Sequence, residues 1–207
     1  MNEKIVYVVD DDDAVRDSAR RLLKIVGYEV ETFDSANAFM DGVDSLKPGC
    51  VIFDINMPGI SGLEAQKQLK ERGAAFPVII LTGQGDIGKA VQAMKNGAVE
   101  FIEKPYQNEA LLNAVEAGFA QLGVRLSEDA ANEKAAGVVG RLSPRERQVL
   151  QGMLTGLPNK LIGHQLGLST RTVEVYRSKV MDKLEVRSLS SAVKLALAAG
   201  LPELEAG

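Results

Sequence analysis

The first half of the chain repeats one pattern: a short apolar run, then a polar residue, then a stretch with helical spacing. The first run, Ile5–Val9, is continuous rather than alternating, which is typical of a parallel strand buried on both faces. Comparable runs predict four more strands, at residues 28–33, 50–53, 78–81 and 99–102. Strands that alternate with helices predict an open parallel α/β sheet.

Residues with helical spacing lie between these runs. Apolar side chains at intervals of three and four residues predict a helix from Val15 to Val26, and Gly27 is a typical residue to end it. The segments 63–72 and 87–96 have the same spacing. We therefore expect five strands to alternate with five helices.

A fifth helix is predicted from about Gln107, and its apolar seam continues for two heptads. The seam consists of Leu112, Val115, Phe119, Leu122 and Leu126. Two interpretations stay open: the seam packs against the sheet, or its distal part pairs with a second subunit. Residues 127–140 contain few large apolar side chains, so we expect a linker there that is partly helical.

Charge divides the chain into two parts. Residues 1–126 hold 13 basic and 19 acidic side chains, a net charge of −6, whereas residues 127–207 hold 11 and 9, a net charge of +2. Residues 140–187 alone hold 9 basic and 4 acidic side chains, a net charge of +5. Because nucleic acid repels acidic surfaces and attracts basic ones, we expect two domains with different partners.

Composition argues against several other classes of protein. No apolar run approaches the ~18 residues of a membrane span, and the residues before the first strand do not have the pattern of a signal peptide. A single cysteine, Cys50, rules out an internal disulfide and fits a reducing compartment. A single histidine, His164, excludes multi-histidine metal sites. These features predict a cytoplasmic protein with no membrane partner.

Polar side chains follow four of the predicted strands. Asp10–Asp13 follow the first strand, Asp54 the third, Thr82 the fourth and Lys104 the fifth. The carboxyl ends of parallel strands form one edge of a sheet, and ligands bind at that edge. We therefore expect carboxylates, a hydroxyl and an ammonium to meet there.

That set of groups suits phosphoryl transfer to an aspartate. Clustered carboxylates raise each other's pKa, and a hard cation such as Mg²⁺ removes their repulsion. A carboxylate beside the metal can accept a phosphoryl group as an acyl phosphate. The metal and Lys104 would neutralise the transferring group, and the Thr82 hydroxyl would donate a hydrogen bond to it.

In this order the motifs resemble the receiver domain of bacterial two-component response regulators. The resemblance covers residues 3–122. Its carriers are Val9-Asp10-Asp11-Asp12, Asp54-Ile55-Asn56-Met57-Pro58-Gly59, Leu81-Thr82-Gly83 and Phe101-Ile102-Glu103-Lys104-Pro105. It implies an α/β flavodoxin-like (CheY-like) fold with a five-stranded parallel sheet.

The resemblance also implies how phosphorylation would occur. Asp54 would be the phosphoacceptor for a sensor histidine kinase. Asp11 and Asp54, with the backbone carbonyl of Asn56, would bind Mg²⁺, and Asp10 would orient a metal-bound water. Lys104 would pair with the carboxylate or the phosphoryl group, and its bond to Pro105 would be cis.

Two further residues would report the phosphorylated state. By the resemblance, Thr82 and Phe101 form a switch pair that turns inward on phosphorylation. Asp12 and Asp13 receive no role in the site and are expected as charges at a helix N-terminus.

A phosphatase of the haloacid dehalogenase type also uses an aspartate nucleophile. Such an enzyme needs a second Asp two residues later as general acid, and Asn56 stands at that position here. We therefore expect a regulator rather than an enzyme.

In receiver domains the positions of Asn56 and Gln84 flank the path of the water that removes the phosphoryl group. Since neither side chain is bulky and cationic, we expect a phosphoryl lifetime of minutes.

The last third of the chain is predicted to be a small all-α domain of four helices. Ser143-Pro144-Arg145-Glu146 is the start pattern of one helix, with Ser at the N-cap, Pro at N1 and Glu at N3. Pro158, Ser169 and Ser188 begin three more. The third helix carries cations outside its apolar face, as a helix that enters the major groove does.

Residues 140–201 resemble the LuxR-type helix-turn-helix of NarL/FixJ-type regulators. The carriers are Leu142-Ser143-Pro144-Arg145-Glu146-Arg147-Gln148-Val149-Leu150, Gly156-Leu157-Pro158-Asn159-Lys160, Leu166-Gly167-Leu168-Ser169 and Thr172-Val173-Glu174-Val175-Tyr176-Arg177. The helix-turn-helix would span residues 159–178. It implies that Glu174, Val175 and Ser178 face base edges. Six other side chains are expected to approach the DNA backbone or to begin the recognition helix beside it. They are Lys160, Thr170, Arg171, Thr172, Arg177 and Lys179.

The helical part departs from this family in several places. Leu161 and Gly163 stand where the family usually has Glu and Ala. A glycine inside a helix costs about 1 kcal/mol relative to alanine, which predicts a looser second helix. Tyr176 replaces a frequent His, with little expected loss. Glu174 can accept a hydrogen bond from cytosine but repels phosphates, so the base preference stays open.

These features together predict a transcription factor switched by phosphorylation. We expect a receiver domain at residues 1–122, a helical extension and linker at 123–139 and a LuxR-type DNA-binding domain at 140–207. The expected partners are a sensor histidine kinase, double-stranded DNA half-sites and, on phosphorylation, a second copy of the chain.

Two other functions fit the sequence less well. A protein-interaction module that binds little DNA conflicts with the +5 segment. A LuxR-type sensor of small molecules conflicts with a first half that offers acids rather than an apolar pocket.

Overall fold

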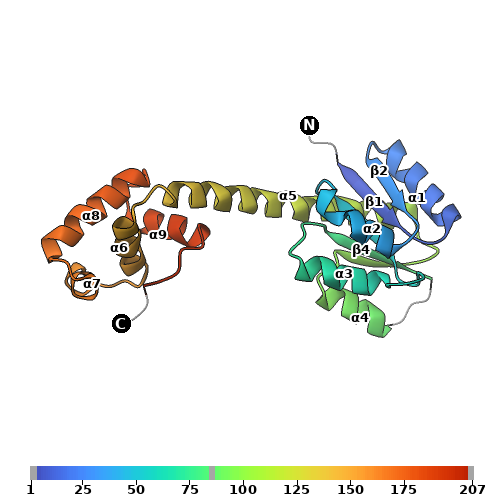
Figure 1. The fold of residues 1–207 in the computed structure, drawn as a ribbon. Helices are drawn as coiled ribbons and strands as arrows, with labels where there is room; N and C mark the ends of the chain where they lie inside the picture. The colour runs from blue at the N-terminus through green and yellow to red at the C-terminus, as the bar shows by residue number, and fades with distance from the viewer. Residues whose placement is uncertain (1–3, 84–86, 205–207) are drawn as a thin grey trace. The chain divides into compact units, whose positions relative to one another are not determined.

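The computed structural model describes residues 4–83 and 87–204, which divide into two compact units. The first unit comprises residues 1–126 and the second comprises residues 127–207. The first unit is the predicted five-stranded parallel sheet between helices (Figure 1). The strand order is β2-β1-β3-β4-β5. The strands are β1 (Ile5–Val9), β2 (Glu29–Phe33), β3 (Cys50–Asp54), β4 (Val78–Thr82) and β5 (Glu100–Glu103).

Helices cover both faces of this sheet. They are α1 (Asp13–Ile25), α2 (Ala36–Gly42), α3 (Gly62–Glu71), α4 (Ile87–Lys95) and α5 (Asn108–Val139), with a 3₁₀ turn η1 (Val43–Ser45) after α2. Alternate residues of β1 enter two separate cores. Tyr7 packs with α2, α3 and α4, whereas Val6 and Val8 pack with α1 and α5.

The central strands are buried on both faces, as their continuous apolar runs predict, but the edge strands are not. Every residue of β1, β3 and β4 is buried. In β2 no residue is fully buried, and in β5 only Ile102 is. An edge strand has a neighbour on one side only, which leaves its other side to solvent.

The helix α5 is longer than the sequence patterns predict. Residues 127–139, expected as a partly helical linker, are helical to Val139. They contain no proline and are rich in alanine and glutamate, which favour helix. The proximal seam packs on the sheet through Val115 and Phe119, whereas Leu126 is 38% exposed.

Although α5 has 32 residues, no helix of the described chain is both long and apolar enough to cross a membrane.

The second unit contains the four predicted helices around their own core. They are α6 (Pro144–Leu154), α7 (Asn159–Leu166), α8 (Thr170–Lys183) and α9 (Leu189–Ala198). The predicted caps are present: Ser143 and Glu146 form a reciprocal capping box, and Ser169 and Ser188 accept hydrogen bonds from the first turns of α8 and α9.

Gly62, the first residue of α3, allows the backbone of this helix to lie against β3. A Cβ atom added to Gly62 would lie 2.2 Å from the carbonyl oxygen of Asp54 and 2.9 Å from the Cβ atom of Phe53. Such contacts require the backbone of α3 or β3 to move. Gly62 therefore holds α3 close to the carboxyl end of β3.

We predict that Gly62→Ala destabilises the first unit by about 1–3 kcal/mol, the usual cost of overpacking. Gly123→Ala is the matched control, because Gly123 lies within α5 with no heavy atom near the added methyl group. The control should gain about 1 kcal/mol from helix propensity. Urea unfolding followed by circular dichroism measures both values. Equal midpoints for Gly62→Ala and the wild type would contradict this account.

Candidate functional site

Four polar side chains lie at or just beyond the carboxyl ends of the sheet strands. Asp54 and Thr82 are the last residues of β3 and β4, Asp10 follows β1, and Lys104 follows β5. Asp10, Asp54 and Thr82 are all buried, at 1%, 5% and 0% exposure. The strands therefore place two carboxylates and a hydroxyl out of bulk water at one edge.

The Lys104 ammonium lies between the two carboxylates. Its Nζ atom is 2.5 Å from Oδ2 of Asp10 and 2.6 Å from Oδ1 of Asp54. Backbone N–H groups donate to the other oxygens: Asp12 N–H to Oδ1 of Asp10 at 3.0 Å, and Asn56 N–H to Oδ2 of Asp54 at 2.6 Å. Each carboxylate thus has a hydrogen bond on both oxygens, which fixes its orientation.

Burial and pairing act in opposite directions on these charges. Burial raises the pKa of Asp10 above its usual range, although hydrogen bonds from Lys104 and the Asp12 amide partly offset this. Burial alone would lower the pKa of Lys104, but its hydrogen bonds to Asp10 and Asp54 outweigh that effect and raise it. Lys104 is therefore a fixed cation.

Thr82 and Phe101 lie on neighbouring strands. In the pairing of β4 with β5, Phe101 is opposite Ile80, two residues before Thr82. Because alternate residues of a strand share a face, Phe101 and Thr82 lie on the same side of the sheet. Thr82 is fully buried, whereas Phe101 is partly exposed. The Thr82 carbonyl also accepts a hydrogen bond from the Lys104 N–H at 2.7 Å.

The oxygen donors at this edge suit a hard cation, but they are not gathered as one ligand set. Asp10, Asp54 and the backbone carbonyl of Asn56 supply the type of oxygen that Mg²⁺ prefers. Within residues 4–83 and 87–204, no three Asp, Glu, His or Cys side chains form a group able to hold a metal. Asp11, which is exposed, is therefore not brought together with Asp10 and Asp54.

Several contacts around the site were not predicted from the sequence. Lys89 Nζ lies 3.4 Å from Oδ1 of Asn56, and Arg16 donates to the Asp10 carbonyl oxygen at 2.5 Å. Arg16 lies about one turn after Asp12, the N-cap of α1, and this spacing brings its side chain near the loop that follows β1. Asn56 and Gln84 are the two positions predicted to flank the path of the attacking water, and Gln84 lies outside the described residues.

The helix cap expected after β1 and the cis peptide bond expected after β5 are both present. Asp12 is the N-cap of α1, accepting from the amides of Ala14 and Val15, and Asp13 lies in the first turn. The Lys104–Pro105 peptide bond is cis.

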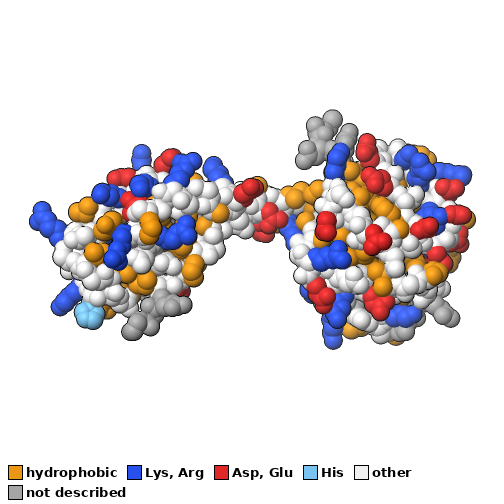
Figure 2. Space-filling view, in the orientation of Figure 1, with side chains coloured by type: hydrophobic (Ala, Val, Ile, Leu, Met, Phe, Trp, Pro, Cys, Tyr) orange, Lys and Arg blue, Asp and Glu red, His pale blue; other side chains and the backbone are white. Residues whose placement is uncertain are grey.

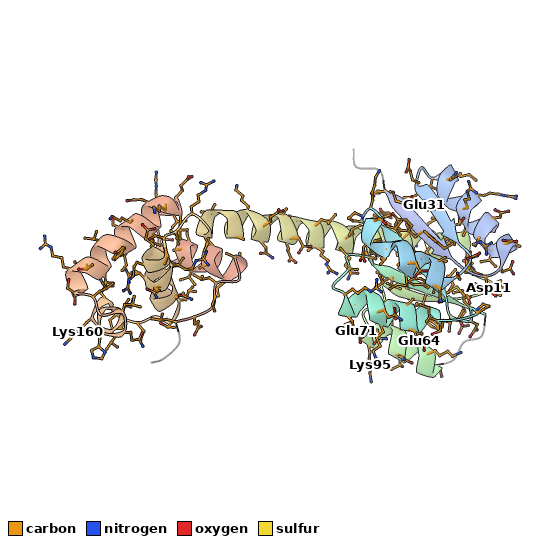
Figure 3. All side chains as sticks on the ribbon, viewed as in Figure 1. Asp11, Glu31, Glu64, Glu71, Lys95 and Lys160 are labelled. Atoms are coloured by element: carbon orange, nitrogen blue, oxygen red, sulfur yellow. The ribbon has the colours of Figure 1, made fainter. Side chains whose placement is uncertain are left out.

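In the second unit, α7 and α8 form a helix-turn-helix, and basic side chains project from its surface (Figure 2). Of the residues predicted to meet DNA, most are exposed, while Thr172 and Arg177 are half-buried. The exposed ones are Lys160, Thr170, Arg171, Glu174, Val175, Ser178 and Lys179. Lys160 lies on α7 (Figure 3), and the other six residues lie on α8.

The recognition helix α8 is tied to its neighbours by two polar contacts. Arg177 donates to Oδ1 of Asn159, at the start of α7, at 2.9 Å. Lys183 donates to Oε2 of Glu146, in the first turn of α6, at 2.7 Å. That hydrogen bond lowers the pKa of Glu146 to about 2, with help from the Ser143 backbone amide. Both contacts join residues that are far apart in the sequence.

The sequence predicts that Gly163 makes α7 looser, and the structure gives a packing reason for a glycine at this position. Gly163 is buried, and a Cβ atom there would lie 2.6 Å from the carbonyl oxygen of Leu168. The Leu168 N–H in turn donates to the Gly163 carbonyl oxygen at 2.8 Å. The glycine therefore permits the tight turn into α8.

Comparison with known proteins identifies both units. Residues 6–116 match the model of the response regulator receiver domain, and residues 140–196 match the model of bacterial regulatory proteins of the luxR family. The chain is 45% identical over 196 residues to the transcriptional regulatory protein FixJ of Bradyrhizobium diazoefficiens, covering 95% of this chain and 96% of that one.

Solved structures give the same result. The response regulator StyR aligns with a TM-score of 0.76 at 42% identity, covering 94% of this chain and 98% of that chain. Full-length FixJ from B. japonicum aligns with a TM-score of 0.60 at 44% identity, covering 97% and 98% of the two chains.

We predict that Lys104→Met raises the pKa of Asp10 further, because burial remains and the hydrogen bond that lowers this pKa is lost. Carboxyl ¹³C NMR across a pH titration measures this change. At pH 7 the variant should also lose about 3 kcal/mol of unfolding free energy, since its buried charges lack their partner. Lys89→Met is the control, because Lys89 lies near Asn56 and is only partly buried. An unchanged Asp10 pKa in Lys104→Met would refute the electrostatic account.

A second prediction concerns Glu146 and acid stability. The folded-state pKa of about 2 lies below the ordinary value of 4.5, so the unfolded chain binds the proton first as the pH falls. The stability that this carboxylate contributes is present above about pH 4.5 and is lost as the pH falls through about 2. Lys183→Met should raise the pKa of Glu146 and flatten this pH dependence. Hydrogen exchange of the α6 amides at several pH values measures this pH dependence of stability. Identical profiles for the wild type and Lys183→Met would contradict the prediction.

Proposed function

This chain belongs to the response regulators of two-component systems, with a receiver domain and a LuxR-type DNA-binding domain, and on that premise we propose how its residues act. The family regulates transcription in a phosphorylation-dependent manner. We assign the receiver domain to residues 1–122, the helical extension and linker to 123–139 and the DNA-binding domain to 140–207.

Asp54 is the proposed phosphoacceptor for a sensor histidine kinase. The observation that carries this assignment is the fixed Asp54 carboxylate, held by the Lys104 ammonium and the Asn56 N–H at the sheet edge. An Asp54 oxygen attacks the phosphorus of a phosphohistidine, a P–O bond forms, and the P–N bond breaks with its electron pair leaving on the imidazole. Lys104 balances the charge on the phosphoryl oxygens, and the Thr82 hydroxyl donates to one of them.

Mg²⁺ is the proposed cofactor of this step. Asp11, Asp54 and the Asn56 carbonyl would hold it, with Asp10 orienting a bound water. When bound, the ion supplies neutralisation of the carboxylates and of the phosphoryl oxygens. Its binding requires Asp11 to approach the other two aspartates.

Phosphorylation is proposed to act through Thr82 and Phe101 on the surface made by α4, β5 and α5. Three apolar side chains of α4 are already exposed on this domain: Ile87 at 83%, Val91 at 48% and Met94 at 49%. Their spacing of four and three residues places them on one helical face. This stripe supports a homodimer that forms on phosphorylation, with inward rotation of Phe101 making room at the interface.

The helix α8 is the proposed reader of promoter DNA. Glu174, Val175 and Ser178 would meet base edges, and the exposed cations Lys160, Arg171 and Lys179 would meet phosphates. Thr170 and Thr172 would approach the backbone at the start of α8. Arg177, already held by Asn159, would present its remaining N–H groups to a phosphate. A dimer would place two such helices on neighbouring half-sites.

Incubation with Mg²⁺ and acetyl phosphate should add one phosphoryl group to the wild type and none to Asp54→Asn. Intact-mass spectrometry measures the adduct. Asp13→Asn is the matched control, because Asp13 is an exposed aspartate in the first turn of α1 and should not affect the yield. An adduct on Asp54→Asn, or none on the wild type, would remove Asp54 from the proposal.

Arg171→Ala and Lys179→Ala should each weaken DNA binding on every sequence and reduce the slope of log affinity against log salt by about 1. The physical reason is the loss of one phosphate contact and of its released counterion. Fluorescence anisotropy with the phosphorylated protein at several salt concentrations measures both quantities. Lys194→Ala, at an exposed lysine of α9, should leave the slope unchanged. Salt-independent binding of the wild type would favour a protein-interaction module instead.

A further inference from the structure

A second ammonium group, on the helix α4, approaches the loop beside the acidic site. Lys89 Nζ lies 3.4 Å from Oδ1 of Asn56, which is the distance of a long hydrogen bond. Lys89 belongs to α4 and Asn56 to the loop after β3, so the contact joins residues that are 33 positions apart in the chain. The proposed phosphoryl transfer does not use this lysine.

Asn56 connects Lys89 to the proposed phosphoacceptor. Its backbone N–H donates to Oδ2 of Asp54 at 2.6 Å, while its exposed side chain accepts from Lys89. Asp54 itself is only 5% exposed, and Lys104 donates to its other oxygen. The Asn56 side chain is therefore open to water directly beside a carboxylate that is not.

The orientation of α4 turns Lys89 toward this loop. Residues two apart in a helix do not share a face, so Lys89 points away from the side of Ile87, which is 83% exposed. Lys89 is half-buried, although lysine is usually among the most exposed residues. The contact with Asn56 is therefore made by the face of α4 that is turned toward the loop after β3.

Hydrolysis of an acyl phosphate depends on how the attacking water is oriented. The water oxygen bonds to phosphorus, and the P–O bond to Asp54 breaks with its electron pair left on the carboxylate. One proton of the water stays on the inorganic phosphate and the other passes to solvent. A lone pair of the water must point at phosphorus while one of its O–H groups donates to an acceptor.

The contact with Lys89 takes that acceptor away. Oδ1 is the only acceptor of the Asn56 side chain, and it already accepts from Lys89. The remaining polar groups of both side chains are N–H donors, which compete with phosphorus for the lone pairs of the water. In this arrangement Asn56 does not help the water to attack.

We propose that Lys89 is a positioning residue that prolongs the phosphorylated state of Asp54. It acts through Asn56, by holding the side-chain amide in an orientation that does not activate water. The inference rests on the proposed phosphorylation of Asp54 and concerns its reversal. Asn56 is not itself a cation, but α4 brings the Lys89 ammonium to it from a distant part of the chain.

The test measures the decay of phosphorylated Asp54 in the full-length protein. The wild type and Lys89→Met are phosphorylated with Mg²⁺ and acetyl phosphate, the phosphodonor is removed by gel filtration, and intact-mass spectrometry follows the loss of the adduct. Both proteins should gain one phosphoryl group. The adduct of Lys89→Met should decay about fivefold faster, because Oδ1 of Asn56 becomes free to accept from the water.

Three further variants separate positioning from charge alone. Lys89→Arg keeps an N–H donor at this position and should restore slow decay. In Asn56→Ala, which has no side-chain acceptor to free, adding Lys89→Met should leave the decay rate unchanged. Lys95→Met is the matched control, because it removes an exposed lysine at the opposite end of α4, and it should decay like the wild type.

Equal or slower decay of Lys89→Met would overturn the role of Lys89 and leave Asp54 as the phosphoacceptor. Undiminished acceleration in the Asn56→Ala background, or the same acceleration by Lys95→Met, would also overturn it. Absence of any adduct on the wild type would instead refute the phosphorylation of Asp54, and this inference with it. Circular dichroism of each variant establishes that it is folded.

A second measurement tests the contact without phosphorylation. The ¹⁵N NMR resonance of the Asn56 side-chain amide should shift in Lys89→Met and stay unchanged in Lys95→Met. An Asn56 resonance that is the same in Lys89→Met and in the wild type would mean that the contact is not made in solution, and the proposal would fail.

Discussion

The ion triad of Lys104 with Asp10 and Asp54 is the interaction on which the first domain depends. It joins the ends of three strands, β1, β3 and β5, that are far apart in the sequence. Burial makes the two carboxylates unfavourable as free ions, and the ammonium and two backbone amides compensate them. A phosphoryl group on Asp54 would change the charge that Lys104 balances. In the proposed mechanism, phosphorylation would therefore alter the charge at this edge.

Two glycines bring backbone close enough for these functional parts to form. Gly62 lets α3 approach the Asp54 carbonyl, and Gly163 lets α7 turn tightly into α8. In both places an added Cβ atom would lie 2.6 Å or less from a backbone carbonyl oxygen. In the proposed function the two positions would serve different chemistry, phosphoryl acceptance and DNA contact, but the physical requirement is the same. A functional side chain is positioned by the close packing of the backbone behind it.

Much of the fold and of the acidic site could be predicted from the sequence. The apolar run of Ile5–Val9 is the strand β1 residue for residue, and the order of Asp10, Asp54 and Lys104 after their strands leads directly to their meeting. The exposure of β2 and β5 was missed, because edge position depends on strand order, which local patterns do not encode. The seam of α5 was ambiguous for the same reason: apolar spacing does not say which surface it contacts.

The sequence by itself determined the strands, the helix caps and the identity of the groups beyond each strand, because these follow from periodicity and from local hydrogen bonding. Away from the strand ends, only the tertiary structure decided which distant residues meet. It pairs Arg177 with Asn159 and Glu146 with Lys183, and it leaves Oε1 of Gln66 buried without a donor among the described residues. Such contacts arise from the packing of whole elements against one another. Neither their distance nor their burial is a property of any short segment of the chain.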